Sequence, residues 1–337
     1  MTQYDIVGIG AALVDTELRV TEDDIRQLGV EKGLMTLCDD QAQQQYIAYL
    51  RDHFNTASRA CGGSAANSMI AAAHLGSSTY MTCQVAHDAD GDWFLEELTQ
   101  ANMGWNHARQ RIDGNTGTCL VLITPDAERT MCTHLGASQY IGPENVEPEA
   151  LDHANYLYLE GYLATSPAGI QAAKLLREKA EETQAAVTLS LSDPGIATHF
   201  RAQLNDMIGE RADIIFCNAD EAIAWTESET LAQALEVLKT RAKRYAVTQG
   251  AQGAVSWDGS ALTEIPAPNV TAVDTNGAGD LFAGCMLGAL NRGLDFNEAA
   301  KLGCYGASQV VTQFGPRLDA AGYQHLSHTL KAAIDRQ

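Results

Sequence analysis

Residues 273–280 read Val-Asp-Thr-Asn-Gly-Ala-Gly-Asp, and they precede residues 281–290, whose apolar side chains recur at helical spacing. The small residues and Asp280 therefore fall on the first turn of a predicted helix. The first N–H groups of a helix have no intrahelical partner and lie at the positive end of its dipole. The amides that could hold an anion there are those of Gly277, Ala278 and Gly279. With Asp280 beside them as a base, this is the chemistry of phosphoryl transfer; the alternative is a glycine-rich helix start with Asp280 as a capping carboxylate.

A second glycine-rich segment, residues 62–67, reads Gly-Gly-Ser-Ala-Ala-Asn and leads into an alanine-rich helix expected at residues 65–75. Glycine lets a substrate approach the backbone, and the Asn67 amide can both donate to and accept from a sugar hydroxyl. A loop with Ser64 as the helix N-cap would use the same residue types. Residues 62–67 therefore predict either an acceptor site or a plain helix start.

The first glycines of the chain raise the alternative of a dinucleotide-binding site. Residues 7–13, Val-Gly-Ile-Gly-Ala-Ala-Leu, follow a predicted strand as a dinucleotide fingerprint does. Leu13 occupies the third glycine position, where a side chain obstructs close helix packing. Residues 14–20 then alternate as an exposed strand does, so the sequence disfavours a nicotinamide or flavin site. The lysine-containing P-loop motif is also absent from the sequence.

Together these motifs resemble those of the ribokinase-like (PfkB) carbohydrate and nucleoside kinases. Residues 274–280 match the C-terminal signature of that family and residues 62–67 the N-terminal one. Further matches follow in family order at residues 8–15, 116–118, 160–161, 218–221 and 248–253. Residues 33–37 and 128–131 most resemble the adenosine-kinase-like branch. The resemblance covers nearly the whole chain and implies an ATP-dependent kinase that phosphorylates a hydroxyl of a nucleoside or sugar.

The resemblance also implies roles for residues around the acceptor. It places Asp15 on two acceptor hydroxyls, and Gly63 and Asn67 on the sugar. It places Arg129 over the transferred phosphoryl group, where a planar guanidinium suits oxygen recognition; otherwise Arg129 is a solvated charge on a strand. Leu163 stands where adenosine-like relatives commonly carry an aromatic residue that stacks on the purine.

On the nucleotide side, the resemblance implies that Asn218 and Glu221 organise Mg²⁺ and the phosphates, with Glu221 acting through water. The same two residues fit a helix capping box, which is the structural alternative. Thr248, Gly250 and Gly253 would lie against the nucleotide, although a tight hairpin would also use such glycines. Some relatives need a monovalent cation such as K⁺, to which Asp274 and residues 311–317 could contribute.

The identity of the acceptor is left open by two departures from the adenosine-kinase pattern. Ala11 replaces an asparagine, and Leu163 replaces the aromatic residue. Tyr162 and Phe282 could serve as aromatic platforms or belong to the core. A kinase of a free pentose or hexose is therefore the alternative, and a non-catalytic sugar- or nucleotide-binding regulator is the alternative from another class.

The elements that must position these residues alternate between strand and helix. This alternation predicts an α/β fold with a central, mostly parallel sheet and helices on both faces, with ligands at the carboxyl ends of the strands. Strands are expected at residues 4–10, 14–20, 79–85, 118–124, 129–134, 156–159, 186–191, 214–217, 244–248 and 254–257. Helices are expected at residues 39–51, 65–75, 92–101, 167–183, 200–209, 221–225, 230–240 and 281–290. The resemblance implies one ribokinase-like domain over residues 1–337, with a small β lid built from roughly residues 14–37 and 112–135.

Composition narrows the classes of partner. The chain carries 22 basic and 43 acidic residues, a formal charge of −21 that disfavours binding to nucleic acid and to anionic membranes. The eight cysteines are scattered without a zinc-like pairing, so reduced, buried thiols are expected. Neither a signal peptide nor an apolar run of eighteen residues is present. These features predict a cytoplasmic enzyme, monomeric or homodimeric, that acts on a small molecule.

Overall fold

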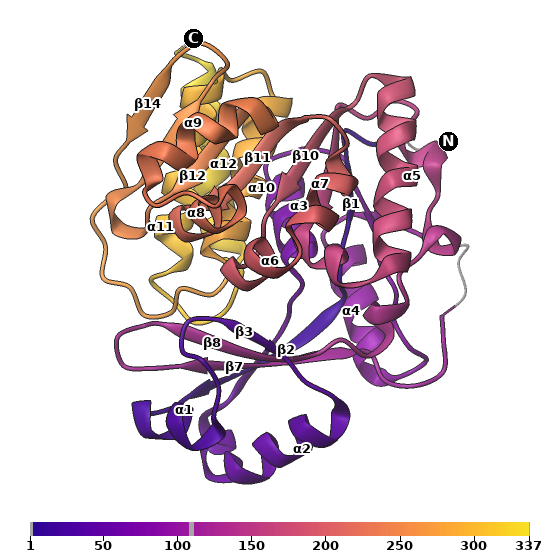
Figure 1. Cartoon of the computed structure of the whole chain (residues 1–337), viewed down its shortest axis with the longest axis vertical. Helices are drawn as coiled ribbons and strands as arrows, with labels where there is room; N and C mark the ends of the chain where they lie inside the picture. Colours follow the sequence, from indigo (N-terminus) through magenta and orange to yellow (C-terminus); the bar gives the residue numbers. More distant parts are fainter. Residues whose placement is uncertain (1–2, 108–110, 337) are drawn as a thin grey trace.

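Two β-sheets of unequal size organise the chain (Figure 1). The structure is a computed structural model and describes residues 3–107 and 111–336. The larger sheet has nine strands in the order β14-β13-β12-β11-β10-β9-β1-β5-β6. The smaller has five strands in the order β3-β8-β7-β2-β4 and lies below the larger body in Figure 1.

The bounds of the elements follow the expected alternation. The strands are β1 (Ile6–Ile9), β2 (Leu13–Arg19), β3 (Met35–Leu37), β4 (Ser58–Cys61), β5 (Thr79–Thr82), β6 (Gly104–Trp105), β7 (Gly117–Ile123), β8 (Arg129–His134), β9 (Tyr156–Glu160), β10 (Ala186–Ser190), β11 (Ala212–Asn218), β12 (Ala242–Thr248), β13 (Ala254–Trp257) and β14 (Leu262–Ile265). The α-helices are α1 (Glu22–Leu28), α2 (Asp40–Tyr49), α3 (Ser64–His74), α4 (Ala89–Gln100), α5 (Pro167–Thr183), α6 (Pro194–His199), α7 (Arg201–Ile208), α8 (Ala219–Thr226), α9 (Leu231–Arg241), α10 (Ala278–Asn291), α11 (Phe296–Val310) and α12 (Ala320–Ile334). Short 3₁₀ turns occupy Arg51–Thr56, Gly136–Tyr140, Pro143–Asn145, Pro148–Leu151, Gly161–Thr165 and Gly250–Gln252.

The larger sheet is parallel from β12 through to β6, whereas β13 pairs antiparallel with both β12 and the edge strand β14. Its strands alternate between two cores, because successive side chains point to opposite faces. In β1, Ile6 belongs to the core that includes residues of α3, α10 and α11, whereas Val7 and Ile9 belong to the core that includes residues of α5 and α8. Helices therefore cover both faces, and the predicted α/β class is confirmed.

The smaller sheet also has two different faces. Leu18, Leu120 and Leu122 point to one face, where they form a core with residues of α1 and α2. Asp15 and Glu17 point to the other, toward the larger body, and both are buried. The expectation of an exposed strand at residues 14–20 is therefore wrong, because the polar face of β2 is covered by the body of the protein.

Several elements differ from the sequence expectation. A strand, β2, follows β1 directly, so the helix that a dinucleotide site needs is not there. The helices α1, α6, α11 and α12 were not expected. All eight cysteines are unpaired and seven are buried, as expected. Within residues 3–107 and 111–336 we find no helix whose length and apolar character would let it cross a membrane.

Candidate active site

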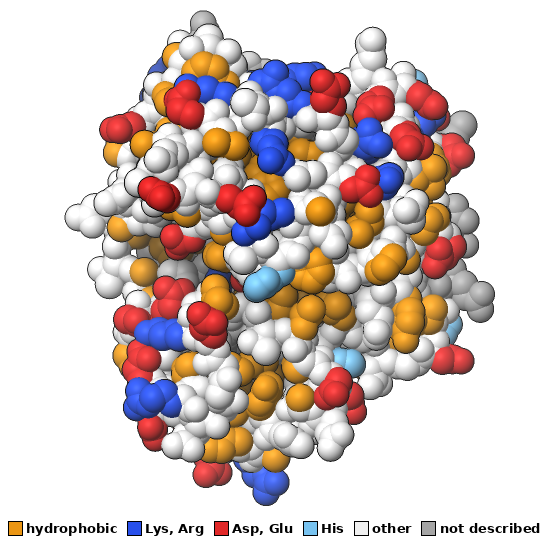
Figure 2. Space-filling view, in the orientation of Figure 1, with side chains coloured by type: hydrophobic (Ala, Val, Ile, Leu, Met, Phe, Trp, Pro, Cys, Tyr) orange, Lys and Arg blue, Asp and Glu red, His pale blue; other side chains and the backbone are white. Residues whose placement is uncertain are grey.

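A cavity of about 970 Å³ lies between the two sheets. Figure 2 shows the molecule hollowed between the larger body above and the smaller sheet below. The residues at or just beyond the carboxyl ends of five parallel strands line it: Ala11, Glu160, Ser192, Asn218 and Thr248. Ligands of open parallel sheets bind at this edge, and the volume lies at the upper end of the usual range for ligand sites. The cavity is thus large enough for a nucleotide and a second small molecule.

Asp280 is the point where the two glycine-rich motifs meet. It lies on the first turn of α10, whose N-cap is Gly277, and its carboxylate does not cap that helix. Instead, Oδ1 accepts from the Ser64 hydroxyl at 2.6 Å and Oδ2 accepts from the Asn67 amide at 2.9 Å. Burial raises the pKa of Asp280, whereas these two hydrogen bonds and the charges of Arg129 and Arg317 lower it. The Ser64 hydroxyl is therefore not an N-cap; Gly63 holds that position in α3.

The glycines at the start of α10 are there for different reasons. Gly277 has φ of 74°, and a Cβ on it would lie 2.3 Å from the Pro316 carbonyl oxygen, so the fold itself requires glycine. A Cβ on Gly279 would meet no atom within 4 Å. Gly277, Ala278 and Gly279 all line the cavity. The absence of a side chain at Gly279 therefore keeps the cavity open at the helix start, where the positive end of the helix dipole suits an anion.

Arg129 lies at the start of β8 and lines the cavity. Its Nε is buried and has no hydrogen-bond partner among the described residues. Its charge lowers the pKa of Asp274, Asp280 and Glu221, against the larger effect of burial. An unpaired buried donor is costly, so the Arg129 guanidinium is suited to an anionic ligand in the cavity.

Asp274 is fully buried and lies beside the segment that precedes α12. Its carboxylate accepts from the backbone N–H of Asn276 at 2.8 Å and of Gly315 at 3.0 Å. The structure thus brings together Asp274 and residues 311–317, as the prediction of a monovalent cation requires. A K⁺ ion there stays a prediction.

Asp15 also lines the cavity, and only 6% of its surface is exposed. Burial, with the nearby charge of Glu17, raises its pKa to about 7, although Arg317 and a hydrogen bond from Asn276 oppose the shift. A Cβ on Gly62 would lie 2.2 Å from the Asp15 carboxylate, which explains why that position is glycine. The carboxylate is therefore desolvated and accessible from the cavity, as a group that accepts from two hydroxyls must be.

Glu160 ends β9 beneath the same region and is fully buried. Its two oxygens accept from the backbone N–H groups of Ala11, at 3.1 Å, and Ala65, at 2.8 Å. It therefore ties the loop after β1 to the start of α3. Burial raises its pKa to about 7 although both N–H groups lower it. The sequence pointed to this residue only as part of the matched pair 160–161.

On the other side of Asp280, Asn218 and Glu221 form the capping box of α8 and also line the cavity. The Asn218 backbone N–H donates to Glu221 Oε2 at 3.0 Å and its side-chain amide donates to Oε1 at 2.8 Å. Burial raises the pKa of Glu221 to about 7. In the described ranges no cluster of three or more His, Cys, Asp or Glu side chains could hold a metal ion. The donor set suits Mg²⁺ that keeps its waters and binds chiefly to phosphate oxygens.

Thr248, Gly250 and Gly253 lie at the cavity wall beyond Glu221. A Cβ on Gly250 would meet no atom within 4 Å, whereas one on Gly253 would lie 2.0 Å from the Ile265 carbonyl oxygen. Packing at the β12–β13 connection therefore requires glycine at position 253. This is the tight-hairpin interpretation of that residue. Gly250 has no such packing constraint and faces open space, although its φ of 56° still favours glycine.

Leu163 does not reach the cavity. It lies in the 3₁₀ turn Gly161–Thr165, packs in the core between the sheet and α5, and is 5% exposed. The structure therefore gives no support to Leu163 as a substrate contact, because its side chain points into the core. The cavity is lined instead by its neighbour Tyr162 and by Phe282.

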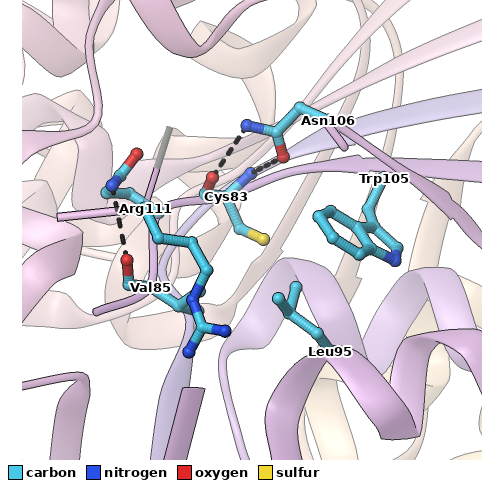
Figure 3. Close-up of a pocket in the computed structure, with 7 residues that line it drawn as sticks. Cys83, Val85, Leu95, Trp105, Asn106 and Arg111 are labelled. Carbon is cyan, nitrogen blue, oxygen red and sulfur yellow. Dashed lines mark hydrogen bonds between the residues drawn. The ribbon is translucent and has the colours of Figure 1, made fainter. Parts of the chain in front are cut away.

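A second cavity, of about 10 Å³, lies near the end of β5 (Figure 3). Asn106 bridges the backbone of Cys83 there, accepting from its N–H at 3.2 Å and donating to its carbonyl at 3.0 Å. Such a volume holds no more than one water molecule. The larger cavity is therefore the candidate active site.

Comparisons with known proteins show the family of the chain. The model of the pfkB family of carbohydrate kinases matches residues 37–321. An adenosine kinase from Schizosaccharomyces pombe is 29% identical over 343 aligned positions, which cover 94% of this chain and 97% of that protein. Two solved structures are each 30% identical: a probable sugar kinase from Rhizobium etli, with a TM-score of 0.91 and 99% of both chains covered, and an adenosine kinase from Sinorhizobium meliloti, with a TM-score of 0.90 and 97% and 100% covered.

Proposed function

The chain belongs to the pfkB family of carbohydrate kinases and is an ATP-dependent kinase, and from this premise we propose that it transfers the γ-phosphoryl group to the primary hydroxyl of an adenosine-like nucleoside. The observation that carries the proposal is the meeting of Ser64 and Asn67 with Asp280 at the floor of the cavity. Ser64 and Asn67 each lie more than 200 positions before Asp280, and both donate to its carboxylate at a helix N-terminus.

In this proposal Asp280 accepts the proton of the acceptor hydroxyl as that oxygen attacks phosphorus. Ser64 and Asn67 each donate to one carboxylate oxygen, which fixes the rotation of the carboxylate and favours its charged form. Each oxygen keeps a lone pair with which to accept the proton. General-base assistance of this kind contributes on the order of 10² to 10⁴ in rate.

The charge that develops on the transferred group is stabilised by groups that need no rearrangement. The N–H groups of Gly277, Ala278 and Gly279 lie at the positive end of α10, where that of Ala278 also donates to the Thr275 carbonyl at 3.3 Å. Arg129 lines the same cavity, and its Nε has no hydrogen-bond partner among the described residues. Preorganised donors of this kind usually account for the largest part of the rate enhancement in phosphoryl transfer.

Asn218 and Glu221 are suited to hold Mg²⁺ through its water ligands, and Thr248 and Gly250 line the wall beyond them. When bound, Mg²⁺ would neutralise the charge on the β- and γ-phosphates. Because the Gly250 position is open, a nucleotide can approach the backbone there without a steric conflict.

The inner face of the smaller sheet favours a nucleoside over a free sugar. Asp15, Cys119, Thr133 and Leu37 are direct partners across β2, β7, β8 and β3, so their side chains share one face. With strands about 4.8 Å apart, this row extends roughly 10 to 14 Å from the carboxylate. Met35 and Met131 lie in the adjacent row and also line the cavity. A ribose diol on Asp15 would therefore leave an apolar, sulfur-rich wall for a flat base.

A specific observation also favours a sugar kinase as the second candidate. Ala11 and Leu163 provide neither the amide nor the aromatic ring that purine recognition in adenosine-like relatives commonly uses, and Leu163 is buried in the core. The similarity to the probable sugar kinase from Rhizobium etli is as high as that to the adenosine kinase from Sinorhizobium meliloti.

A phosphorylation screen tests the proposal. We expect Mg-ATP to be consumed with adenosine or a close nucleoside analogue and far more slowly with ribose, fructose or glucose. Asp280→Asn should lower kcat by at least about 10²-fold with ATP affinity nearly unchanged, because the side chain acts only when the acceptor proton moves. Preferential use of a free sugar would establish the second candidate. ATP binding without turnover on any acceptor would identify the protein as a non-catalytic binding protein. Near-normal turnover by Asp280→Asn would show that Asp280 is not the base.

A further inference from the structure

Arg317 lies behind the floor of the active site, in the segment between α11 and α12. Its side chain is 13% exposed, and it is not among the residues that line the cavity. Nε donates to Asn67 Oδ1 at 2.8 Å, and Nη1 is 3.3 Å from Glu97 Oε2 on α4. Nη2 is buried without a hydrogen-bond partner among the described residues. A cation is thus held directly against the amide that contacts Asp280.

The guanidinium decides which way the Asn67 amide faces. Asn67 is 3% exposed, and its Nδ2 donates to Asp280 Oδ2 at 2.9 Å. The two ends of an amide differ only in that one accepts and the other donates, and a guanidinium can only donate. The amide oxygen must therefore face Arg317, and the NH₂ group must face Asp280. With the amide reversed, its oxygen would face a carboxylate and its NH₂ group a cation, and both hydrogen bonds would be lost.

We propose that Arg317 is a positioning residue for phosphoryl transfer: by fixing the orientation of the Asn67 amide it keeps the Asp280 carboxylate ionised and rotated toward the acceptor hydroxyl. The inference rests on the proposed base role of Asp280. Arg317 itself touches neither the acceptor nor ATP. It acts on the reacting atoms through the Asn67 side chain and through its own charge, as outer-sphere residues do at other catalytic sites.

The groups that face Asp280 make this contribution measurable. The positive charges are Arg129 on β8 and Arg317, which both lower its pKa. Asp15 on β2, Glu160 and Tyr158 on β9, and Tyr323 on α12 are acids close enough to interact with it. Removal of Arg317 takes away one of the two cations and releases the amide that donates to Oδ2. The pKa of Asp280 should then rise, and the acidic limb of the pH–activity profile should move to higher pH.

The test compares Arg317→Met with Arg317→Lys and with Arg201→Met. Arg201 is a matched control, because its guanidinium is also held by a carbonyl, that of Ala224, and by a carboxylate, that of Glu227. It does not line the cavity. We expect Arg317→Met to lower kcat by about tenfold to hundredfold with little change in the KM for ATP. The acidic limb of the pH profile of kcat/KM should move to higher pH by roughly half a unit or more. The Lys variant should recover most of this shift, and Arg201→Met should show none.

A ¹³C NMR titration of the Asp280 carboxyl carbon gives the same information without turnover, so it distinguishes failure of this inference from failure of the proposed function. A higher pKa in Arg317→Met than in the wild type supports the inference even if no acceptor is found. An unchanged pKa with an unmoved acidic limb, or a Lys variant that matches the Met variant, would assign Arg317 a purely structural role. If Arg317→Met does not fold, Asn67→Asp takes its place. That variant keeps a charged partner for Arg317 but replaces the donor to Asp280 with an anion, so an unmoved pKa there would overturn the inference.

Discussion

Asp15 shows how binding and stability compete at a single residue. The carboxylate is 6% exposed, and burial raises its pKa to about 7. No described residue neutralises it by a direct ion pair, although Arg317 lies close enough to lower its pKa. Such a desolvated acceptor is poorly satisfied until a ligand donates to it. We therefore expect the acceptor diol to be recognised chiefly here.

Asp15→Ala should weaken acceptor use by roughly 2 to 4 kcal/mol in kcat/KM, because the two hydroxyls lose their shared partner in a water-poor site. ATP binding should stay nearly unchanged. A 2′-deoxynucleoside should be a poor substrate of the wild type but should lose much less on mutation. Steady-state kinetics with both acceptors on both proteins measures the interaction as a double comparison.

The same comparison can refute the placement of the acceptor. If Asp15→Ala penalises the ribo- and deoxynucleoside equally, the residue does not contact the diol. The loss would then arise from general damage to the smaller sheet, and the acceptor would have to bind elsewhere in the cavity.

At this scale the sequence predicted the residues whose chemistry lies within short motifs. Asp280, Gly279, Asn67 and Asp15 all line the cavity. They could be predicted because each belongs to a short local pattern of small and polar residues. The contact of Arg317 with Asn67 spans 250 positions, and no local spacing encodes it. Leu163 was predicted to contact the acceptor, but its side chain lies in the core. The orientation of the short 3₁₀ turn that carries it depends on packing against α5, which no local sequence pattern encodes.

Among the elements, α10 carries the most direct test of the anion site. A Cβ on Gly279 meets open space, so Gly279→Val should fold with a melting temperature close to that of the wild type. The valine side chain would fill the space over the first-turn N–H groups of α10, and turnover should fall by at least about 10²-fold. Scanning calorimetry and single-turnover kinetics on the same preparation check both statements.

Gly277→Val is the matched control for that variant. At this position φ is positive and a Cβ would meet the Pro316 carbonyl, so the substitution should lower the melting temperature markedly. If Gly279→Val retained full activity, Gly279 would only be a residue of the helix start, and phosphate would bind elsewhere.

Of the helices that sequence reasoning missed, α11 has a buried face on which small residues outnumber the large apolar residues Phe296, Leu302 and Val310. In α11 the buried face includes Ala299, Gly303, Cys304 and Gly306. A Cβ on Gly303 or Gly306 would lie 2.9 or 2.6 Å from atoms of α10, so close packing of the two helices selects small residues there. A search for large apolar side chains passes over such a face. In α12 a signal was present, since Tyr323, Leu326 and Leu330 recur at helical spacing.

For the molecule as a whole, the buried carboxyls predict how stability depends on pH. Asp15, Glu160 and Glu221 each have a pKa of about 7 in the folded protein, above the ordinary values of 3.8 and 4.5. The folded state therefore binds more protons than the unfolded state between about pH 4 and pH 7. Over this window the free energy of unfolding falls as pH rises, and above it the destabilisation from these groups is complete.

We expect the melting temperature of the ligand-free protein to fall between pH 5.5 and pH 8. Asp15→Asn should flatten part of this slope and raise the melting temperature at pH 8 by roughly 2 to 4 °C, while acceptor use is lost. Asp113→Asn, which removes an exposed acid, should leave the slope unchanged. Scanning calorimetry across the pH range measures the melting temperature of each variant. If the melting temperature of Asp15→Asn depends on pH as steeply as that of the wild type, Asp15 does not contribute to the pH dependence.

The long separation between the motifs has a consequence for the timing of biosynthesis. Ser64 and Asn67 leave the ribosome early, whereas Asp280 follows 216 positions after Ser64, and Arg317 follows 250 positions after Asn67. At about 5 to 20 residues per second, the first motif waits roughly 10 to 50 s for its last partner. A nascent or prematurely terminated chain that ends before Asp280 cannot hold the assembled floor of the site, and one that ends before Arg317 lacks the residue that orients Asn67. If Asp280 is the base, we expect catalytic activity to appear only after α10 has been synthesised and has packed against α3, and not when the strands of the sheet first pair.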